Sequence, residues 1–423
     1  MRKHLSLVLA CTLCALGISC HENTEVYTPN HAEVAENDGT ITRTFAEPDN
    51  AKELKGTPSE NLKAILETVG PGIITSLGSM NITEGEYNEI KAFTDELVAG
   101  KTTQTEKYKT IFNWVYKSLT FNDFSNPAWY NMGNDPYEVF TNRVAVCQGY
   151  SNLMTVMCHS QGIPTMVVNG LVYASAWNID LGHAWAYTYP DSTWIVSDPT
   201  NNGYWKMSDI KSYTHLKPQQ VEFELYRDNS IVCEYSNFAV NIKEVLQGDD
   251  SYTLPYSAMG FVINSFNPTV ELPENITEIY VGQNITSLGT DDNMKLFNNG
   301  KHLQAMYVDK NNPTLMDNKG IVYKKNGNSP QLYYIPGGMT FIELLPMEIV
   351  DKNTIYSHMS VEEIYFPEGT KRLENYAIEN CPKLKRIYVP ADAVVAKEAI
   401  YNVPNEVEIV RGTPSGITHV TMD

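Results

Sequence analysis

The chain has 423 residues, of which 42% are hydrophobic and 19% charged, as is typical of a globular protein with a sizeable core. At roughly 150 residues per domain, this length indicates two or three domains. The net charge of -19 excludes the basic surface that nucleic-acid binding requires, so no nucleic acid is expected as a partner.

The first twenty residues predict a lipoprotein signal peptide. Arg2 and Lys3 precede an apolar stretch, residues 5–19, which is too short to span a bilayer comfortably and therefore indicates an export signal. Its end, LGISC, resembles a bacterial lipobox. The resemblance implies cleavage after residue 19, lipidation of Cys20 and an outer membrane lipoprotein that faces the periplasm or the cell surface. The alternative is an ordinary secretory signal with a chance cysteine.

The next part of the chain predicts a tether and then helices. Residues 20–50 are polar and lack apolar periodicity, which indicates a flexible tether to the membrane. The helical period then predicts three helices, at residues 61–69, 84–98 and 105–118. Residues 121–145 are rich in Asn, Asp and Pro and predict a loop.

A helix followed by strands predicts an α+β domain over residues 51–250. In residues 146–164 the apolar positions again follow the helical period, and Gly162 and Pro164 mark the end of the helix. The pattern then changes to strands, at residues 165–174, 183–189 and 193–198. Helices that precede an antiparallel sheet are typical of the α+β class.

Three residues of this domain predict a thiol enzyme when they are taken together. Cys147 begins the helix, where free backbone N–H groups and the helix dipole favour the reactive thiolate. His183 begins a strand and supplies a base, and Asp198 ends the next strand and can orient the imidazole. Each residue alone also has a structural interpretation: a buried cysteine, a structural histidine and a strand terminator.

The turn between the two strands decides whether His183 and Asp198 can meet. A two-residue turn pairs them directly, and a four-residue turn pairs His183 with Thr200 and makes Asp198 its diagonal neighbour. In both registers the side chains share a face, about 5 to 8 Å apart at Cβ. A three-residue loop puts them on opposite faces.

Four motifs resemble the transglutaminase-like superfamily over roughly residues 100–210. They are VCQGY at residues 146–150, GIP at 162–164, HAW at 183–185 and DPT at 198–200. The resemblance implies a papain/transglutaminase-like fold with Cys147 as nucleophile, His183 as general base and acid, and Asp198 as orienter. Val146 departs from the Gly-Val or Gly that many members have before the cysteine, and this departure does not touch the triad.

The stabilisation of the oxyanion is less visible in the sequence. The backbone N–H of Cys147 is the natural first donor. Candidates for a second donor in the upstream loop are Trp129, Tyr130 and Asn142. Trp177 and Asn178 precede His183 and either rim the cleft or pack the loop. Cys158, three helical turns beyond Cys147, is expected in the core, and His159 is given no catalytic role.

Short Tyr-containing segments recur near the C-terminus and predict a solenoid over residues 255–410, followed by a tail at 411–423. Their aligned tyrosines, 280, 307, 334, 365 and 388, lie 27, 27, 31 and 23 residues apart, which indicates stacked repeats that each give one strand. Residues 308–313, 320–323 and 376–384 resemble BspA-like leucine-rich repeats of Bacteroides-type surface proteins. This resemblance implies binding of a host or cell-surface ligand, and a spacer is the alternative. Cys381 falls at a core position.

These observations favour a surface-anchored thiol acyl-transfer enzyme that hydrolyses peptide or amide bonds, a cysteine peptidase or amidase acting on a peptide or protein substrate. Transfer to a lysine amine, which cross-links, is a less favoured outcome. The alternatives are a non-catalytic adhesin whose repeats carry the function, and a carbohydrate-binding protein that uses exposed aromatic side chains. No cofactor is expected, and no ligand spacing predicts a metal site.

Overall fold

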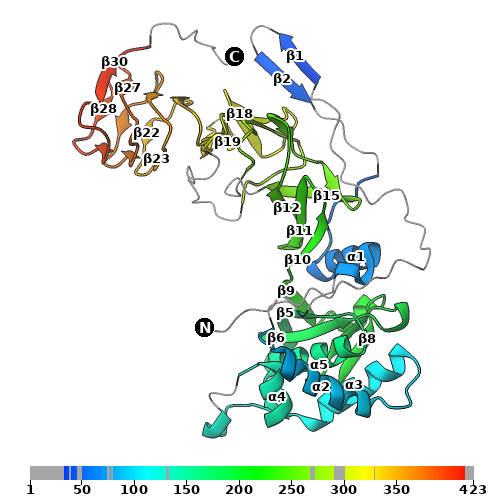
Figure 1. Ribbon diagram of the computed structural model, residues 1–423. Coiled ribbons are helices and arrows are strands. Elements are labelled where there is room, and N and C mark those ends of the chain that lie inside the picture. The colour runs from blue at the N-terminus through cyan, green and yellow to red at the C-terminus, as the bar shows by residue number, and fades with distance from the viewer. Residues whose placement is uncertain are drawn as a thin grey trace. The chain divides into compact units, whose positions relative to one another are not determined.

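The computed structural model describes most of the chain (Figure 1). The described residues are the backbone of 33–37 and 40–44, and residues 50–73, 77, 80–129, 133–266, 272–289, 301–327 and 329–414. The predicted signal peptide and Cys20 lie outside them. Within the predicted tether, β1 (Glu33–Asn37) and β2 (Thr40–Thr44) form an antiparallel pair.

The described chain divides into two compact units. The first comprises residues 54–223 and Tyr235–Phe238. The second comprises the described residues before Leu54, Glu224–Glu234 and the chain from Ala239 onward. The first unit holds the helices and the sheet that the sequence predicts for the enzyme domain. Its boundary lies at Phe223, whereas the sequence extends that domain to residue 250.

The predicted helices of the first unit are confirmed, and each begins with the same sequence signal. They are α1 (Pro58–Val69), α2 (Glu84–Leu97) and α3 (Gln104–Ser118). A threonine precedes each helix and a glutamate follows three residues later, and the two side chains satisfy each other's backbone N–H groups in a capping box. With this signal α1 begins three residues before the predicted start.

The predicted loop at residues 121–145 is wrong in part. It contains the helix α4 (Pro136–Asn142) and the strand β4 (Val144–Ala145), which pairs with β3 (Thr120–Phe121). Asp135 caps α4 by accepting the N–H groups of Tyr137 and Glu138, and proline at the first helical position preorganises the turn. The segment contains many other Asn, Asp and Pro residues that indicate a loop, so these start signals do not stand out in the sequence.

The helix α5 (Cys147–Ser160) is the centre of the first unit, and most of its residues are buried. It packs among α2, α3 and α4, and these helices cover one face of the sheet (Figure 1). Gly149 is required near its start, because a Cβ there would lie 2.6 Å from the Cβ of Ala145 and 2.9 Å from Cγ2 of Val139. The glycine of the VCQGY motif therefore lets the first turn of α5 pack against α4 and β4.

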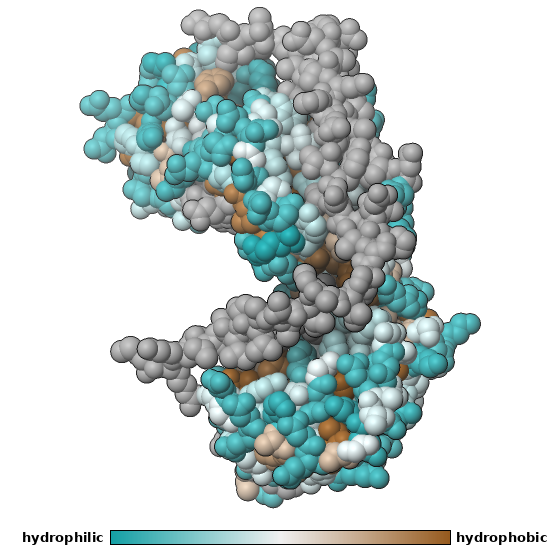
Figure 2. Space-filling model, turned by 45° about the vertical axis from the view of Figure 1, so that its right-hand side comes forward, coloured by the Kyte–Doolittle hydropathy of each residue, from teal (hydrophilic) through white to brown (hydrophobic). Residues whose placement is uncertain are grey.

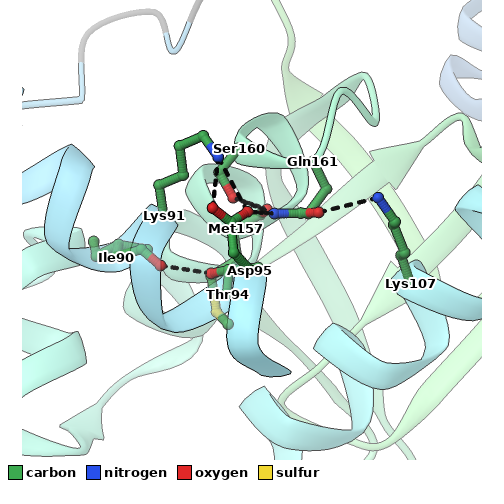
Figure 3. Close-up of polar contacts among 8 residues, drawn as sticks. All are labelled: Ile90, Lys91, Thr94, Asp95, Lys107, Met157, Ser160 and Gln161. Carbon is green, nitrogen blue, oxygen red and sulfur yellow. Dashed lines mark hydrogen bonds and ion pairs between the residues drawn. The ribbon is translucent and has the colours of Figure 1, made fainter. Parts of the chain in front are cut away.

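Polar contacts fix the other end of α5 (Figure 3). Gln161, the C-cap residue, donates from Nε2 to Asp95 of α2 at 2.7 Å and accepts from Lys107 of α3 at 3.2 Å. Lys91 pairs with the same carboxylate of Asp95 at 2.7 Å. One amide therefore links the end of α5 to both neighbouring helices.

The sheet of the first unit has five strands in the order β8-β7-β6-β5-β9, and all its neighbouring pairs are antiparallel. The strands are β5 (Thr165–Ala174), β6 (Ile179–Thr188), β7 (Ile195–Asp198), β8 (Gly203–Lys206) and β9 (Leu216–Gln220). The α+β class is confirmed. The strand β6 begins four residues before the predicted one.

The register of β6 and β7 is that of the four-residue turn. Ala186 pairs with Ser197 and Thr188 with Ile195, so the ladder extrapolates to His183 opposite Thr200. A contact with α3 stabilises this turn: the carboxylate of Asp191 accepts hydrogen bonds from the backbone N–H groups of Gln104 and Thr105 at the start of α3. Asp198 is consequently the diagonal neighbour of His183, as the second of the two favourable registers requires.

The second unit is built from strands. Its first sheet has the order β10-β11-β12-β15-β14, with bounds Phe223–Arg227, Ile231–Ser236, Ala239–Val245, Phe261–Phe266 and Ser257–Ala258. A parallel sheet of β13 (Ser251–Thr253), β16 (Glu278–Val281) and β17 (Ala305–Val308) follows. The chain then enters a regular stack of parallel strands.

This stack confirms the predicted solenoid. Its main sheet is β21 (Phe341–Glu343), β24 (Glu363–Tyr365), β27 (Arg386–Val389) and β30 (Glu408–Arg411), paired in parallel with registers that advance by 22 or 23 residues. Two short parallel sheets run beside it: β22 (Ile349–Val350), β25 (Arg372–Leu373) and β28 (Val394–Val395), and β23 (Ile355–Tyr356), β26 (Ile378–Glu379) and β29 (Ile400–Tyr401). Isoleucines of successive units fill the core, and Cys381 is buried there as predicted.

One predicted repeat segment is misassigned. Tyr333 and Tyr334 lie in β20 (Gln331–Tyr334), which joins an antiparallel sheet with β18 (Leu315–Asn318) and β19 (Ile321–Lys324) rather than the parallel stack. The strand that continues the stack is β21. The tight turn at Lys319 and Gly320, both with positive φ, folds β18 onto β19, and β20 then pairs with β19.

The surface that Figure 2 shows is mainly hydrophilic, and hydrophobic residues form small separate areas on it. Among the exposed large hydrophobic side chains of the described chain, Trp177 is the most exposed at 70%. In the described residues there is no helix with the length and apolar character that a membrane crossing requires.

Candidate active site

Cys147 occupies the first position of α5, as the sequence predicts. The N-cap residue, Val146, has no side chain that can cap the helix, so the first backbone N–H groups keep their hydrogen-bonding capacity for other acceptors. The thiol is only partly buried, whereas Cys158, Cys233 and Cys381 are fully buried. Cys147 therefore combines an electropositive helix start with access from outside.

His183 of β6 and Asp198, at the end of β7, form a buried pair. Nε2 of His183 lies 2.9 Å from Oδ2 of Asp198, and the side chains are 6% and 1% exposed. His183 stacks against Trp185, with ring centroids 6.1 Å apart. Because Nε2 is engaged by the carboxylate, Nδ1 is the ring nitrogen that remains for the thiol.

The carboxylate of Asp198 is fixed by donors on both oxygens. Oδ1 accepts the backbone N–H groups of Thr200 at 3.2 Å and Asn201 at 3.3 Å. Oδ2 accepts the side-chain amide of Asn201 at 2.9 Å, in addition to the imidazole. A buried carboxylate with this set of hydrogen bonds does not rotate freely, so it holds the imidazole ring in one orientation.

The thiol of Cys147 and the imidazole of His183 shift each other's pKa. Burial raises the pKa of Cys147, but hydrogen bonding and charge from His183, together with the backbone N–H groups of Ala184 and Gln148, lower this pKa below its ordinary value. Burial lowers the pKa of His183, and the hydrogen bonds with Asp198 and Cys147 outweigh burial and raise it to about 9. Both shifts favour a thiolate beside an imidazolium.

A groove of about 420 Å³ opens over the thiol. Its lining comes from the start of α5, the middle of β5, the part of β6 around the histidine and the end of β9: Cys147, Gln148, Asn169, Gly170, Leu171, Gly182, His183, Ala184, Gln219 and Gln220. Apart from the thiol and the imidazole, these residues are neutral amides or small and apolar. The groove is therefore suited to an uncharged amide-containing ligand.

The geometry supplies one oxyanion donor and leaves the second unassigned. As the first residue of α5, Cys147 has a backbone N–H without an acceptor inside the helix. Asn142 is exposed at the end of α4 and is not among the residues that line the groove. The side chain of Trp129 and all of Tyr130 lie outside the described residues.

Other candidate residues lie elsewhere. Trp177 and Asn178 belong to the exposed turn between β5 and β6, where Asn178 accepts a hydrogen bond from Tyr173 at 2.7 Å, and neither lines the groove. Cys158 is buried in the core, as predicted, and burial raises its pKa to about 12. His159 contacts the backbone carbonyl of Thr165 at 2.7 Å.

Sequence reasoning missed several groove residues and Asn201. Asn201 follows the DPT motif directly, and an aspartate at a strand end that caps its own turn is the signal that could have found it. Gln219 and Gln220 have no such signal, because they reach the groove only through the pairing of β9 with β5. Among the described residues no cluster of three or more His, Cys, Asp or Glu side chains could hold a metal ion.

Residues 91–199 match the family model described as the transglutaminase-like superfamily. The matched segment runs from within α2 to the residue after Asp198, and so includes the thiol, the imidazole and the carboxylate. No curated protein matches the sequence at the level of significance required.

Several solved structures are similar over parts of the chain. A candidate cysteine protease from Cytophaga hutchinsonii is 21% identical with a TM-score of 0.24, over 37% of this chain and 50% of that one. The periplasmic domain of TgpA from Pseudomonas aeruginosa is 22% identical with a TM-score of 0.24, over 29% and 46%. A leucine-rich repeat protein from Eubacterium ventriosum is 16% identical with a TM-score of 0.22, over 31% and 37%. The chain thus spans half or less of each of these proteins, and the similarities are too distant to identify a function.

Proposed function

We propose that the chain is a thiol acyl-transfer enzyme that hydrolyses peptide or amide bonds. The starting point is the match of residues 91–199 to the transglutaminase-like superfamily. The observation that carries the proposal is the linked geometry of Cys147, His183 and Asp198, with the pKa of the thiol lowered and that of the imidazole raised. A purely structural role for these residues requires neither shift.

In the proposed reaction His183 holds the proton of the Cys147 thiol. The thiolate Sγ attacks the amide carbonyl carbon, and the backbone N–H of Cys147 donates to the oxygen that gains charge. The carbon–nitrogen bond breaks as His183 returns the proton to the leaving amine, which leaves a thioester on Cys147. Water then attacks the thioester, His183 takes the proton of that water, and the carboxylic acid and the free thiol are released.

The acceptor decides between hydrolysis and cross-linking. Water as acceptor gives a peptidase or amidase, and a lysine amine gives a cross-link. Among the described residues that line the groove there is no carboxylate that would attract a protonated lysine. Hydrolysis is therefore the favoured outcome, and transfer to an amine is the less favoured one.

The proposal is tested with denatured, alkylated protein mixtures as substrate. Wild type is expected to generate new peptide termini detectable by mass spectrometry, and Cys147→Ala is expected to generate none. A fluorescent primary amine in the same reaction reports cross-linking. Amine incorporation without new termini contradicts hydrolysis, and the absence of both supports the alternative in which the repeats carry the function.

We also propose that the enzyme is anchored by lipid on Cys20, at the outer membrane, and that its repeats bind a host or cell-surface ligand. The support is the lipobox-like end of the signal and the resemblance of the repeats to surface proteins. Expression in a bacterium fed with labelled palmitate tests the anchor, because Cys20→Ala should abolish labelling. Labelling that persists in this variant contradicts the anchor at Cys20.

A further inference from the structure

One edge of β6 is unpaired beside the thiol. The strand β7 pairs with β6 only at Ala186–Thr188, because the chain turns back after Asp198, which pairs with Gly203 of β8. From Ile179 to the histidine, β6 therefore has β5 on one side and, among the described residues, no strand on the other. An unpaired strand edge presents backbone N–H and C=O groups that can pair with another chain.

The hydrogen-bonding direction along β6 follows from its neighbours. Tyr173 of β5 donates its backbone N–H to the carbonyl of His215. The backbone N–H and C=O groups of Tyr173 therefore point toward β9 and away from β6. Its partner on β6 is Asp180, so the backbone N–H and C=O groups of Asp180 point away from β5. Since the direction alternates along a strand, Gly182 and Ala184 share the direction of Asp180, toward the open edge.

Ala184 provides an independent check of this direction. Its backbone N–H lowers the pKa of Cys147, so the thiol lies on the side of β6 that this N–H faces. Gly182 is the next residue along β6 with the same direction, about 7 Å away. In the described chain its N–H and C=O have no backbone partner.

Gly182 is accessible over the face of the sheet. Gly182 is exposed, it lines the groove, and a Cβ built on it would meet no atom within 4 Å. Steric crowding within the protein therefore does not require glycine here, and a glycine inside a strand often marks the close approach of another backbone.

We propose that the substrate is an extended polypeptide segment that pairs with this open edge of β6, with one of its residues exchanging N–H and C=O hydrogen bonds with Gly182. This inference rests on the proposed acyl transfer at Cys147. The added strand continues the sheet past the end of β7 and brings a substrate carbonyl next to the thiolate. Affinity then comes from the backbone, so unfolded or flexible chains are the substrate class.

The test uses peptide probes whose backbone can be altered one position at a time. The probe is an epoxysuccinyl group with three alanines on each arm, which alkylates Cys147 by opening of the epoxide. Six further probes each carry one N-methyl group. If one substrate N–H donates to Gly182, methylation at that position slows the second-order rate of alkylation by roughly 2- to 12-fold, the range expected for one hydrogen bond, and the other positions change it much less.

Iodoacetamide, which needs the thiolate and no peptide binding, separates the two possible failures. If Cys147 reacts with iodoacetamide only as fast as an ordinary thiol, the proposed function itself fails. If iodoacetamide reacts quickly but all six methylated probes keep the rate of the parent, or lose rate equally, strand pairing is overturned. Rapid iodoacetamide reaction with one sensitive position supports both.

A variant assigns the sensitive position to Gly182. Gly182→Pro removes the N–H that faces the open edge. Because the two hydrogen bonds between Gly182 and the substrate residue form together, loss of one also weakens the other. The ratio between the rates of the parent and of the sensitive methylated probe should therefore fall toward one in this variant. An undiminished ratio in Gly182→Pro contradicts pairing at this residue.

Discussion

Nε2 of His183 lies 2.9 Å from Oδ2 of Asp198, and this contact leaves Nδ1 as the ring nitrogen for Cys147. The buried carboxylate stabilises the imidazolium, which is a main reason why the pKa of His183 rises to about 9. The proton that the leaving amine needs is therefore held until the pH exceeds about 9. Above that pH His183 loses it, and acyl transfer should decline.

Replacing the carboxylate with an amide tests this account. In Asp198→Asn the pKa of His183 should fall from about 9 toward its ordinary value, so the alkaline limit of peptide cleavage should move to lower pH. The pH dependence of cleavage by wild type and variant measures the shift. Glu67→Gln, which changes an exposed carboxylate on α1, is the control and should keep the alkaline limit of wild type. An unchanged limit in Asp198→Asn would contradict the role of Asp198.

Asn201 should act as a positioning residue for the same pair. Its side-chain amide donates to Oδ2 of Asp198 at 2.9 Å and lies 3.5 Å from Nε2 of His183. Asn201→Ala removes this donor and should lower the rate of cleavage by roughly 2- to 12-fold, the range expected for one hydrogen bond. The position of the alkaline limit is the second readout. A loss of rate without any shift of the limit would indicate a merely structural role.

Gln161 should contribute to the stability of the first unit. Its amide contacts both Asp95 and Lys107, and Gln161→Ala removes both hydrogen bonds, so the free energy of unfolding should fall by about 1 to 3 kcal/mol. Urea titration measures this change. Lys63→Ala breaks an exposed pair on α1 and should cost at most about 0.5 kcal/mol. Equal effects of the two variants would contradict the bridging role of Gln161.

The solenoid offers a matched pair of isoleucines. Ile364 is fully buried in β24, whereas Ile349 in β22 is 50% exposed. Ile364→Ala should lower the free energy of unfolding of the second unit by about 2 to 5 kcal/mol, because it leaves a cavity in the core. Ile349→Ala should change it by less than about 1 kcal/mol. Thermal unfolding followed by circular dichroism compares the two, and similar losses would contradict the stacked core.

The sequence was sufficient where local signals and periodicity agree. The helices α3 and α5 and the strand β5 follow their predicted ranges closely, since capping residues and apolar spacing mark them directly. For the register of β6 and β7, the sequence left turns of two, three and four residues open. In the observed register the turn residue Asp191 contacts the start of α3, and this contact joins segments far apart in the chain.

Pairing between distant strands explains what the sequence could not predict. Tyr334 carries the same local pattern as Tyr365, yet a tight turn before it assigns it to an antiparallel sheet. Gln219 and Gln220 reach the groove because β9 pairs with β5, and no local pattern indicates that pairing. Residue type and spacing therefore predicted the candidate catalytic residues, and the order of strands in the sheet determined which other residues line the groove.

The most direct test of the account is the rate of iodoacetamide alkylation of Cys147 against pH, in wild type and in His183→Ala. Burial raises the pKa of Cys158 and of Cys233 to about 12, so these thiols serve as internal controls. Cys147 of wild type is predicted to react well below the pH at which an ordinary thiol ionises, and His183→Ala should shift its reaction to higher pH. If Cys147 reacts like an ordinary thiol in both proteins, there is no thiolate–imidazolium pair and the acyl-transfer proposal is contradicted.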